Sequence, residues 1–166
     1  MQLPDKIFII GWFGSWKSSL AQHISKIKKI PCFDLDDIRW VKKYSHRLSD
    51  GQRKQKLDEI LHHQSQRIIE GCVIDWADVC YTSADLVILF KVPGYIIVWR
   101  VFTRYIYRLF HWMYAGSLWW VMYIMYWAFM YYQKPKGKYS FVRHLEDCKK
   151  HMCKYIVIRD AKEILK

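Results

Sequence analysis

The residues whose types and spacing could do chemistry begin in the stretch IFIIGWFGSWKSSLA, residues 7–21. Two glycines, a lysine and a serine there keep the spacing G-x-x-x-x-W-K-S, which is typical of a phosphate-binding loop. In such a loop, backbone N–H groups point at phosphates from the start of a helix, the lysine reaches their oxygens, and the serine hydroxyl binds Mg²⁺. The pattern therefore predicts a site for ATP and Mg²⁺ formed by Gly11, Trp12, Phe13, Gly14, Ser15, Trp16, Lys17, Ser18 and Ser19.

Trp16 departs from this pattern, because the position before the lysine is ordinarily glycine. The backbone at that position passes close to the phosphates and leaves little room for a side chain. The indole either swings out to solvent, where it could stack on a nucleotide base, or takes the place of the phosphates. The alternative interpretation of the whole stretch is a basic helix N-terminus that follows an ordinary strand.

The elements that must position this loop alternate between short apolar segments and helical ones. Strands are expected at residues 6–11, 31–37, 67–71, 84–93 and 154–160, and helices at 17–29 and 49–66. Alternation of this kind is typical of a parallel sheet with helices on both faces. We therefore expect one α/β domain over residues 1–166, with a five-stranded parallel sheet, its first strand central and the loop at that strand's C-terminal end.

Residues 94–138 are basic, aromatic and helical in pattern, and we expect them to form a lid-like segment. Within them, residues 112–132 carry no charge over 21 positions. That is long enough to span a bilayer, but Trp, Tyr and Met dominate and both flanks are basic. A strand that follows and joins the same sheet also argues against a span. Three alternatives stay open: a packed or self-associating helix, a helix on a membrane surface, or a true span.

The distribution of charge and the number of cysteines indicate which partners and which cellular compartment suit this protein. Residues 1–92 carry 14 Lys/Arg and 11 Asp/Glu, whereas residues 93–166 carry 13 Lys/Arg and 4 Asp/Glu. The formal net charge of +12 therefore lies mostly in the C-terminal half. This asymmetry favours a polyanionic partner, although no motif supports direct nucleic-acid binding. The five scattered cysteines favour reduced thiols in a cytoplasmic protein over a metal site or disulfides.

Four further stretches resemble a known family in order and spacing. They are FDLDDIRW (33–40), RLSDGQRKQKLDEIL (47–61), IIEGCVIDW (68–76) and ADLVILFKVPGYIIVWRVFTR (84–104). Together with the loop, they resemble the topology-modulation-protein group of P-loop proteins, which are relatives of adenylate and other nucleoside monophosphate kinases. The resemblance covers nearly the whole chain. It implies a P-loop kinase fold and, with Trp16 in the loop, a degenerate form of the nucleotide site.

The resemblance also implies roles for individual residues. Lys17 would neutralise charge on the transferring phosphoryl group, and Ser18 would bind Mg²⁺. Asp36 would face the phosphoryl acceptor, and Glu70, before Gly71, would organise Mg²⁺ through water on the acceptor side. The alternatives are that Asp36 or Asp34 only caps the helix that follows, and that Glu70 is a surface acid at the end of a strand.

Three arginines complete the implied site. Arg100 and Arg104, one helical turn apart, would clamp the triphosphate, and Arg53 would bind the acceptor's phosphate. The alternatives are a solvated or membrane-facing basic helix for Arg100 and Arg104, and a plain surface position for Arg53.

Two functional hypotheses follow from this sequence. The first is an ATP-binding, Mg²⁺-dependent phosphotransferase that acts on a nucleotide or another small acceptor. The second is a non-catalytic relative that acts as a binding module at a membrane surface, a partner protein or nucleic acid. Under either hypothesis, residues 112–132 are the segment expected to meet a membrane or a second copy of the chain.

Overall fold

The computed structural model describes residues 3–41, 46–72, 76–111, 117–133 and 140–164. Its strands are β1 Lys6–Ile10, β2 Cys32–Asp34, β3 Arg67–Gly71, β4 Leu86–Phe90 and β5 Tyr155–Ile158. Its α-helices are α1 Lys17–Lys28, α2 Leu35–Arg39, α3 Asp50–His63, α4 Val79–Ser83, α5 Gly94–Phe110, α6 Leu118–Gln133 and α7 Phe141–Lys150. A short 3₁₀ helix at Ala161–Glu163 follows β5.

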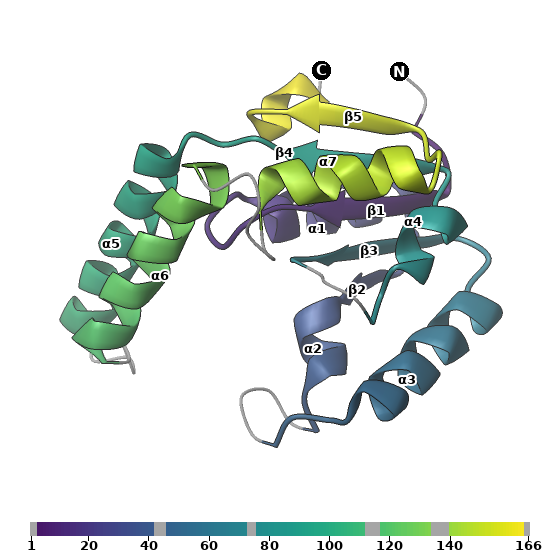
Figure 1. Ribbon diagram of the computed structural model, residues 1–166, viewed down its shortest axis with the longest axis horizontal. Helices are drawn as coiled ribbons and strands as arrows, with labels where there is room; N and C mark the ends of the chain where they lie inside the picture. The colour runs from purple at the N-terminus through teal and green to yellow at the C-terminus, as the bar shows by residue number, and fades with distance from the viewer. Residues whose placement is uncertain (1–2, 42–45, 73–75, 112–116, 134–139, 165–166) are drawn as a thin grey trace.

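The five strands form one parallel sheet in the order β2-β3-β1-β4-β5 (Figure 1). The first strand is therefore central, as the alternation of apolar and helical segments predicts. Strands β3 and β4 are buried along their whole length, which is why their sequences, RIIEG and LVILF, are nearly continuous in apolar residues. Because all strands run the same way, β1, β2 and β3 end at one edge of the sheet, where their polar residues can meet.

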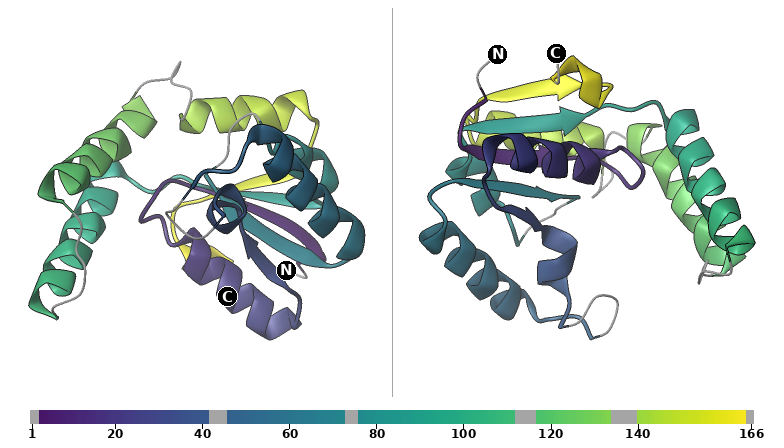
Figure 2. Two further views of the ribbon diagram at one scale, coloured as in Figure 1. Left: turned by 90° about the horizontal axis from the view of Figure 1, so that it is seen from below. Right: turned by 180° about the vertical axis from the view of Figure 1, so that it is seen from behind.

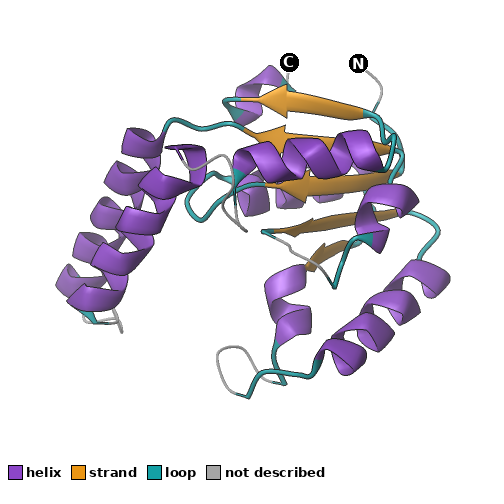
Figure 3. Cartoon of the chain, viewed as in Figure 1, coloured by secondary structure: helices purple, strands orange, loops and turns teal. Residues whose placement is uncertain are grey.

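Helices cover both faces of the sheet, as expected for this arrangement of strands. Figures 1 and 3 show α7 in front of the central strands, and the view from behind in Figure 2 shows α1 over the opposite face. Helix α3 begins at a capping box, in which Ser49 and Gln52 each bond to the other's backbone N–H. These layers fix the loop after β1 between the sheet and the start of α1.

Helices α5 and α6 form an antiparallel pair that extends away from the sheet (Figures 1 and 2). We call this pair the α5–α6 hairpin. Its base contacts the rest of the molecule through Ile97, Ala128 and Tyr131, which are buried. Among the described residues, no helix is both long enough and apolar enough to cross a membrane. Of the uncharged segment 112–132, residues 112–116 lie outside the described residues and the rest belong to α6 and the turn before it.

The expected second strand, residues 31–37, is wrong in its second half. The strand ends at Asp34, whose carboxylate accepts a hydrogen bond from the Asp36 backbone N–H at 2.8 Å and so caps α2. A side chain that can accept from the backbone two residues on competes with the strand hydrogen bonds and favours a helix start. The other expected elements occur within three residues of their expected ends.

The described cysteines are free thiols that pack as small apolar side chains. Burial raises the pKa of the Cys32 thiol to about 11 and that of the Cys80 thiol to about 12. Both thiols are therefore protonated and unreactive at neutral pH.

Candidate functional site

The loop between β1 and α1 has the backbone geometry of an anion-binding turn. Gly14 and Trp16 both adopt left-handed conformations, with φ of 76° and 71°, on either side of Ser15. No side chain caps the N-terminus of α1, and its first turn contains no acidic residue. Uncapped amide groups at the start of a helix carry a partial positive charge that favours an anion.

The Trp16 indole lies outside the loop. Half of the residue's surface is exposed, and the Arg100 guanidinium carbon lies 4.7 Å from the centroid of the indole ring. Arg100 also donates from Nη1 to the Gly14 carbonyl at 3.2 Å. One arginine of α5 thus binds the loop backbone and stacks on the loop's tryptophan. That this exposed position leaves the place of the phosphates free is a proposal.

The other large residues of the loop turn in two directions. Trp12 is buried and packs on Tyr131 of α6, with ring centroids 5.0 Å apart. Phe13 is exposed and meets Trp12 edge to face. Trp12 therefore ties the loop to the α5–α6 hairpin, and it offers a ligand only its backbone.

Lys17 and Glu70 form a buried ion pair beneath the loop. Lys17 Nζ lies 2.7 Å from Glu70 Oε2, and both side chains are almost fully buried. Burial alone would lower the pKa of Lys17, but the charge and hydrogen bond of Glu70 outweigh burial, so the pKa is raised. Lys17 is therefore fully charged at neutral pH, desolvated and held at the end of β3.

Two carboxylates at the end of β2 stand near this pair. Asp34 is opposite Glu70 in the register of β2 and β3, and Asp36 follows in the first turn of α2. Both acids act on the charge of Lys17. Burial and the negative charge of Asp34 raise the pKa of Asp36, while Lys17 opposes that rise. Asp34 is the helix cap, which leaves the Asp36 carboxylate available for other chemistry.

Gly71 sets how closely α2 approaches the sheet. A Cβ atom at Gly71 would lie 2.8 Å from Leu35 Cβ, which is closer than two such atoms can pack. Leu35 opens α2, so the absence of a side chain at Gly71 lets the helix that carries Asp36 lie directly against β3. Gly71 thus positions the helix that carries Asp36, and the expectation that Gly71 also belongs to the acceptor-binding residues stays a prediction.

Arg53 is buried, so the alternative interpretation of Arg53 as a plain surface residue is wrong. Its Nε donates to the Leu48 carbonyl at 2.7 Å, and Nη1 lies 2.9 Å from Asp50 Oδ1. Burial lowers the pKa of Arg53, the Asp50 carboxylate opposes that change, and the positive charges of Arg47 and Arg39 add to it. Arginines from α2, α3 and the segment before α3 therefore interact electrostatically.

Arg39 is a residue that the sequence pattern did not single out. It acts electrostatically on Asp36, one turn earlier on α2, as well as on Arg53. Its Nε is buried and has no hydrogen-bond partner in the described part of the chain. A signal was present in the sequence, since Arg39 follows Asp36 by three residues and therefore shares its side of the helix.

The remaining predicted residues lie at differing depths. Ser18 is partly buried in the first turn of α1, and Ser19 beside it is exposed. Gly11 is buried, and a Cβ atom there would lie 2.5 Å from Ser15 Oγ. Arg104 is exposed one turn beyond Arg100, farther along α5 from the buried Ile97 contact.

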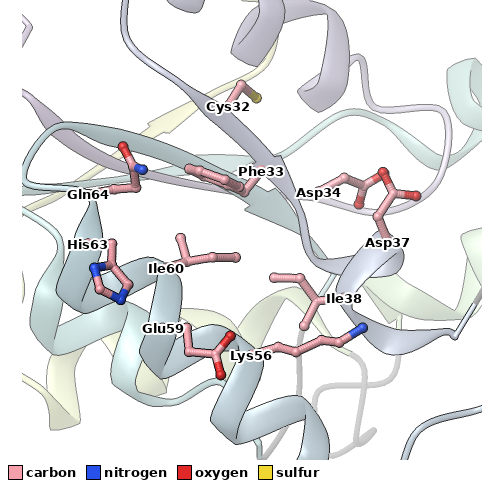
Figure 4. Close-up of a pocket in the computed structure, with 10 residues that line it drawn as sticks. All are labelled: Cys32, Phe33, Asp34, Asp37, Ile38, Lys56, Glu59, Ile60, His63 and Gln64. Atoms are coloured by element: carbon pink, nitrogen blue, oxygen red, sulfur yellow. The ribbon is translucent and has the colours of Figure 1, made fainter.

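A cavity of about 540 Å³ opens between β2, α2 and α3 (Figure 4). It is lined by Cys32, Phe33, Asp34, Asp37, Ile38, Lys56, Glu59, Ile60, His63 and Gln64. None of the predicted loop residues lines it, and neither does Asp36 or Glu70. Of the carboxylates near Lys17, Asp34 lines this cavity, and we assign the cavity no role in the site.

In the described ranges, no group of three His, Cys, Asp or Glu side chains is arranged to hold a metal ion. The polar groups around Lys17 are nevertheless of the kind that Mg²⁺ prefers: carboxylate oxygens of Asp34, Asp36 and Glu70, and the hydroxyl of Ser18. Mg²⁺ is usually bound by one or two carboxylates together with phosphate oxygens and water, and this donor set fits that pattern.

Several solved structures share this fold. A shikimate kinase from Acinetobacter baumannii in complex with shikimate has a TM-score of 0.54 at 13% identity, covering 96% of this chain and 89% of that one. A shikimate kinase from Bacteroides thetaiotaomicron has a TM-score of 0.53 at 16% identity, covering 93% and 85%. A gluconokinase from Sinorhizobium meliloti 1021 has a TM-score of 0.53 at 15% identity, covering 99% and 89%.

Similarity in sequence is weaker. The chain is 26% identical over 91 residues to YqaC, an uncharacterized protein of Bacillus subtilis (strain 168), which is 55% of this chain and about half, 51%, of YqaC. No family model matches the chain. The comparisons therefore show the fold of shikimate kinase and gluconokinase, a P-loop fold of the nucleoside monophosphate kinase type.

Proposed function

We propose that this protein is an ATP-dependent, Mg²⁺-dependent kinase of a small acceptor that carries a hydroxyl and an anionic group. The outward position of Trp16, held by Arg100, is the observation that carries the proposal, because it leaves the loop backbone open to phosphates. The order and spacing of the sequence motifs further support a relationship with the topology-modulation group. On this proposal the loop works despite its tryptophan.

The start of α1 supplies the main groups of the proposed nucleotide site. The uncapped amide groups of its first turn would bind the β- and γ-phosphates, and the Lys17 ammonium would exchange part of its contact with Glu70 for a phosphate oxygen. Arg100 already lies at the loop and would place its guanidinium on the same phosphates. Arg104 would add a second charge from the next turn of α5. Mg²⁺, when bound by Ser18 and Glu70 together with the phosphates, would neutralise charge on them.

Helix α2 supplies the main groups of the proposed acceptor site. A raised pKa brings the Asp36 carboxylate closer to the operating pH, which suits a general base. Arg39 and Arg53 place positive charge near Asp36, and Arg39 has a buried Nε without a partner in the described residues. An acceptor with a carboxylate or phosphate would satisfy these arginines and present its hydroxyl to Asp36.

The transfer itself then needs little covalent chemistry from the protein. The acceptor oxygen forms a bond to the γ-phosphorus while the bond from that phosphorus to the β,γ-bridging oxygen breaks, and ADP leaves with the electron pair. Asp36 accepts the proton of the acceptor hydroxyl. Lys17 and Arg100 stabilise the charge that develops on the transferring group and on the leaving oxygen.

Calorimetric titration of the whole protein with ATP tests the nucleotide side. We expect binding with Mg²⁺ and much weaker binding with EDTA, and we expect Lys17→Ala to abolish binding. Lys26→Ala is the matched control, because Lys26 is an exposed lysine on the same helix. No detectable heat from wild type with ATP and Mg²⁺ would overturn the kinase proposal and leave the binding-module hypothesis.

A coupled assay of ADP release tests which class of acceptor the protein phosphorylates. The panel contains shikimate, a sugar acid, a neutral sugar and nucleoside monophosphates. We expect turnover with one of the anionic acceptors, and we expect Arg39→Ala to raise its KM with a smaller effect on kcat. Turnover restricted to the neutral sugar would contradict the assignment of the arginines.

A further inference from the structure

The α5–α6 hairpin carries large apolar side chains on the surface that faces away from the sheet. Four of them decide the case: Phe110, Leu118, Trp119 and Met122, which are 53–81% exposed. Phe110 ends α5 and Leu118 begins α6, so these residues reach the end of the hairpin that lies farthest from the sheet (Figures 1 and 2). The proposed reaction uses none of these apolar side chains.

Helix α6 is apolar on both of its sides. Val121 and Ala128 are buried, whereas Trp119 on the opposite side of the helix is exposed, as are Leu118 and Met122 between them. A helix that is apolar all round normally has apolar surroundings all round. An exposed apolar surface of this kind marks an interaction site.

The charge around this surface has one sign. Residues 86–145 form a run of 60 residues with no Asp or Glu and eight Lys or Arg. Two of these cations, Arg104 and Arg108, are exposed on the outer half of α5, beside the apolar residues at its end. The partner must therefore be apolar inside and negatively charged at its surface.

We infer that the outer end of the hairpin, residues 104–110 and 118–122, docks on the surface of an anionic lipid bilayer. Its tryptophan and phenylalanine rings enter the boundary between headgroups and acyl chains, and Arg104 and Arg108 meet the lipid phosphates. A second copy of the chain fits less well, because it would bring two positive surfaces together. Nucleic acid also fits less well, since Leu118 and Met122 offer no ring to stack on a base.

Co-sedimentation of the whole protein with vesicles tests this inference. We expect binding to vesicles of phosphatidylcholine mixed with phosphatidylserine, much weaker binding to phosphatidylcholine alone, and a decrease as salt is added. Phe110→Asp with Trp119→Asp removes the apolar contacts and should abolish sedimentation. Arg104→Gln and Arg108→Gln should each weaken binding roughly fivefold, since a basic residue near an anionic surface contributes about 1 kcal/mol.

Matched variants elsewhere in the molecule show whether a loss of vesicle binding is specific to the hairpin surface. Ile27→Asp alters an exposed apolar residue on α1, and Lys54→Gln alters an exposed cation on α3, and neither should change vesicle binding. Unchanged thermal unfolding of the hairpin variants shows that they fold, as expected for exposed positions. The inference is wrong if the double aspartate variant sediments like wild type.

Two other outcomes would also overturn it. Association in the absence of lipid, dispersed by the double aspartate variant in analytical ultracentrifugation, would assign the surface to a second copy of the chain. Retention of a single-stranded oligonucleotide, with no sedimentation on either vesicle, would assign it to nucleic acid. None of these readouts depends on ATP binding, so they stand apart from the proposed kinase activity.

Discussion

The Arg100 guanidinium lies over the Trp16 indole at 4.7 Å, and the same arginine donates a hydrogen bond to the Gly14 carbonyl. A residue of α5 therefore holds the side chain that breaks the loop's usual pattern away from the loop. The stacking and the hydrogen bond together hold the guanidinium beside the backbone of the loop after β1.

Replacing Trp16 tests whether its indole obstructs nucleotide binding. We expect Trp16→Gly to change the affinity for ATP and Mg²⁺ by less than about threefold, because the ring lies outside the loop. Stability should change little, since relief of the left-handed backbone, about 1–2 kcal/mol, offsets the lost cation–π contact, about 0.5–1 kcal/mol. Trp16→Ala is the control that removes the ring and keeps the strain, so it should be the less stable variant. Calorimetry and thermal unfolding measure both effects, and a gain in affinity of tenfold or more would contradict the outward position.

Lys17→Met should destabilise the protein, because it leaves the Glu70 carboxylate buried without its partner. We expect a loss of about 3–5 kcal/mol near neutral pH, with partial recovery at acidic pH as Glu70 takes up a proton. The double variant Lys17→Met with Glu70→Gln should lie much closer to wild type. Denaturant unfolding at several pH values measures this, and a single variant as stable as wild type would show that the pair contributes nothing.

The same ion pair predicts a loss of stability at alkaline pH. The folded state raises the pKa of Lys17 above its ordinary value of 10.5, so the contribution of the charged lysine is complete below that value. It is lost as the pH rises through the higher pKa of the folded state. The Lys17→Met, Glu70→Gln variant lacks this titration, so its free energy of unfolding should fall less steeply above pH 10.5. Equal slopes for the two proteins would argue against the raised pKa.

Asp36→Asn should separate stability from activity. Because the folded state raises the pKa of Asp36, the charged carboxylate opposes folding above that pKa, and stability rises as the pH falls through it. The asparagine variant should therefore be as stable as wild type or more stable at neutral pH, while turnover falls by roughly 10²–10⁴-fold. Asp37→Asn, an exposed neighbour on the same helix, is the matched control and should keep its activity. An Asp36→Asn variant that keeps full turnover would rule out Asp36 as the base.

Gly71→Ala tests the close approach of α2 to the sheet. The added methyl group would meet Leu35, and we expect a loss of about 1–3 kcal/mol of stability, as for other overpacked cores. Gly51→Ala is the matched control: nothing lies within 4 Å of its added methyl group, and it sits within α3. That variant should be unchanged or up to about 1 kcal/mol more stable, because alanine favours a helix over glycine. Equal stability of the two variants would show that α2 can shift without cost.

Much of the fold could be predicted from local sequence pattern. RIIEG and LVILF are continuous apolar runs, and both form buried strands at the expected places. The second strand was predicted too long, because the choice between strand and helix there depends on the side chain of Asp34. Burial of a strand follows from composition, whereas its end depends on one competing hydrogen bond.

The site was less predictable, because its decisive contacts join distant parts of the chain. The side of the loop on which Trp16 lies depends on Arg100, which belongs to α5. Arg39 and Arg53 interact only because α3 folds back toward α2. Spacing in the sequence identifies residues that share an element, but no local pattern reports a contact of this kind.

The absence of a side chain at Gly14 has a mechanical consequence. A Cβ atom there would lie 3.4 Å from Ile97 Cγ2 and 3.6 Å from Val101 Cγ2, so the first two turns of α5 rest directly on the loop. From that contact the helix runs outward over its 17 residues, a length of about 25 Å at 1.5 Å per residue. One end of α5 therefore contacts the loop after β1, while the other end extends about 25 Å away from it.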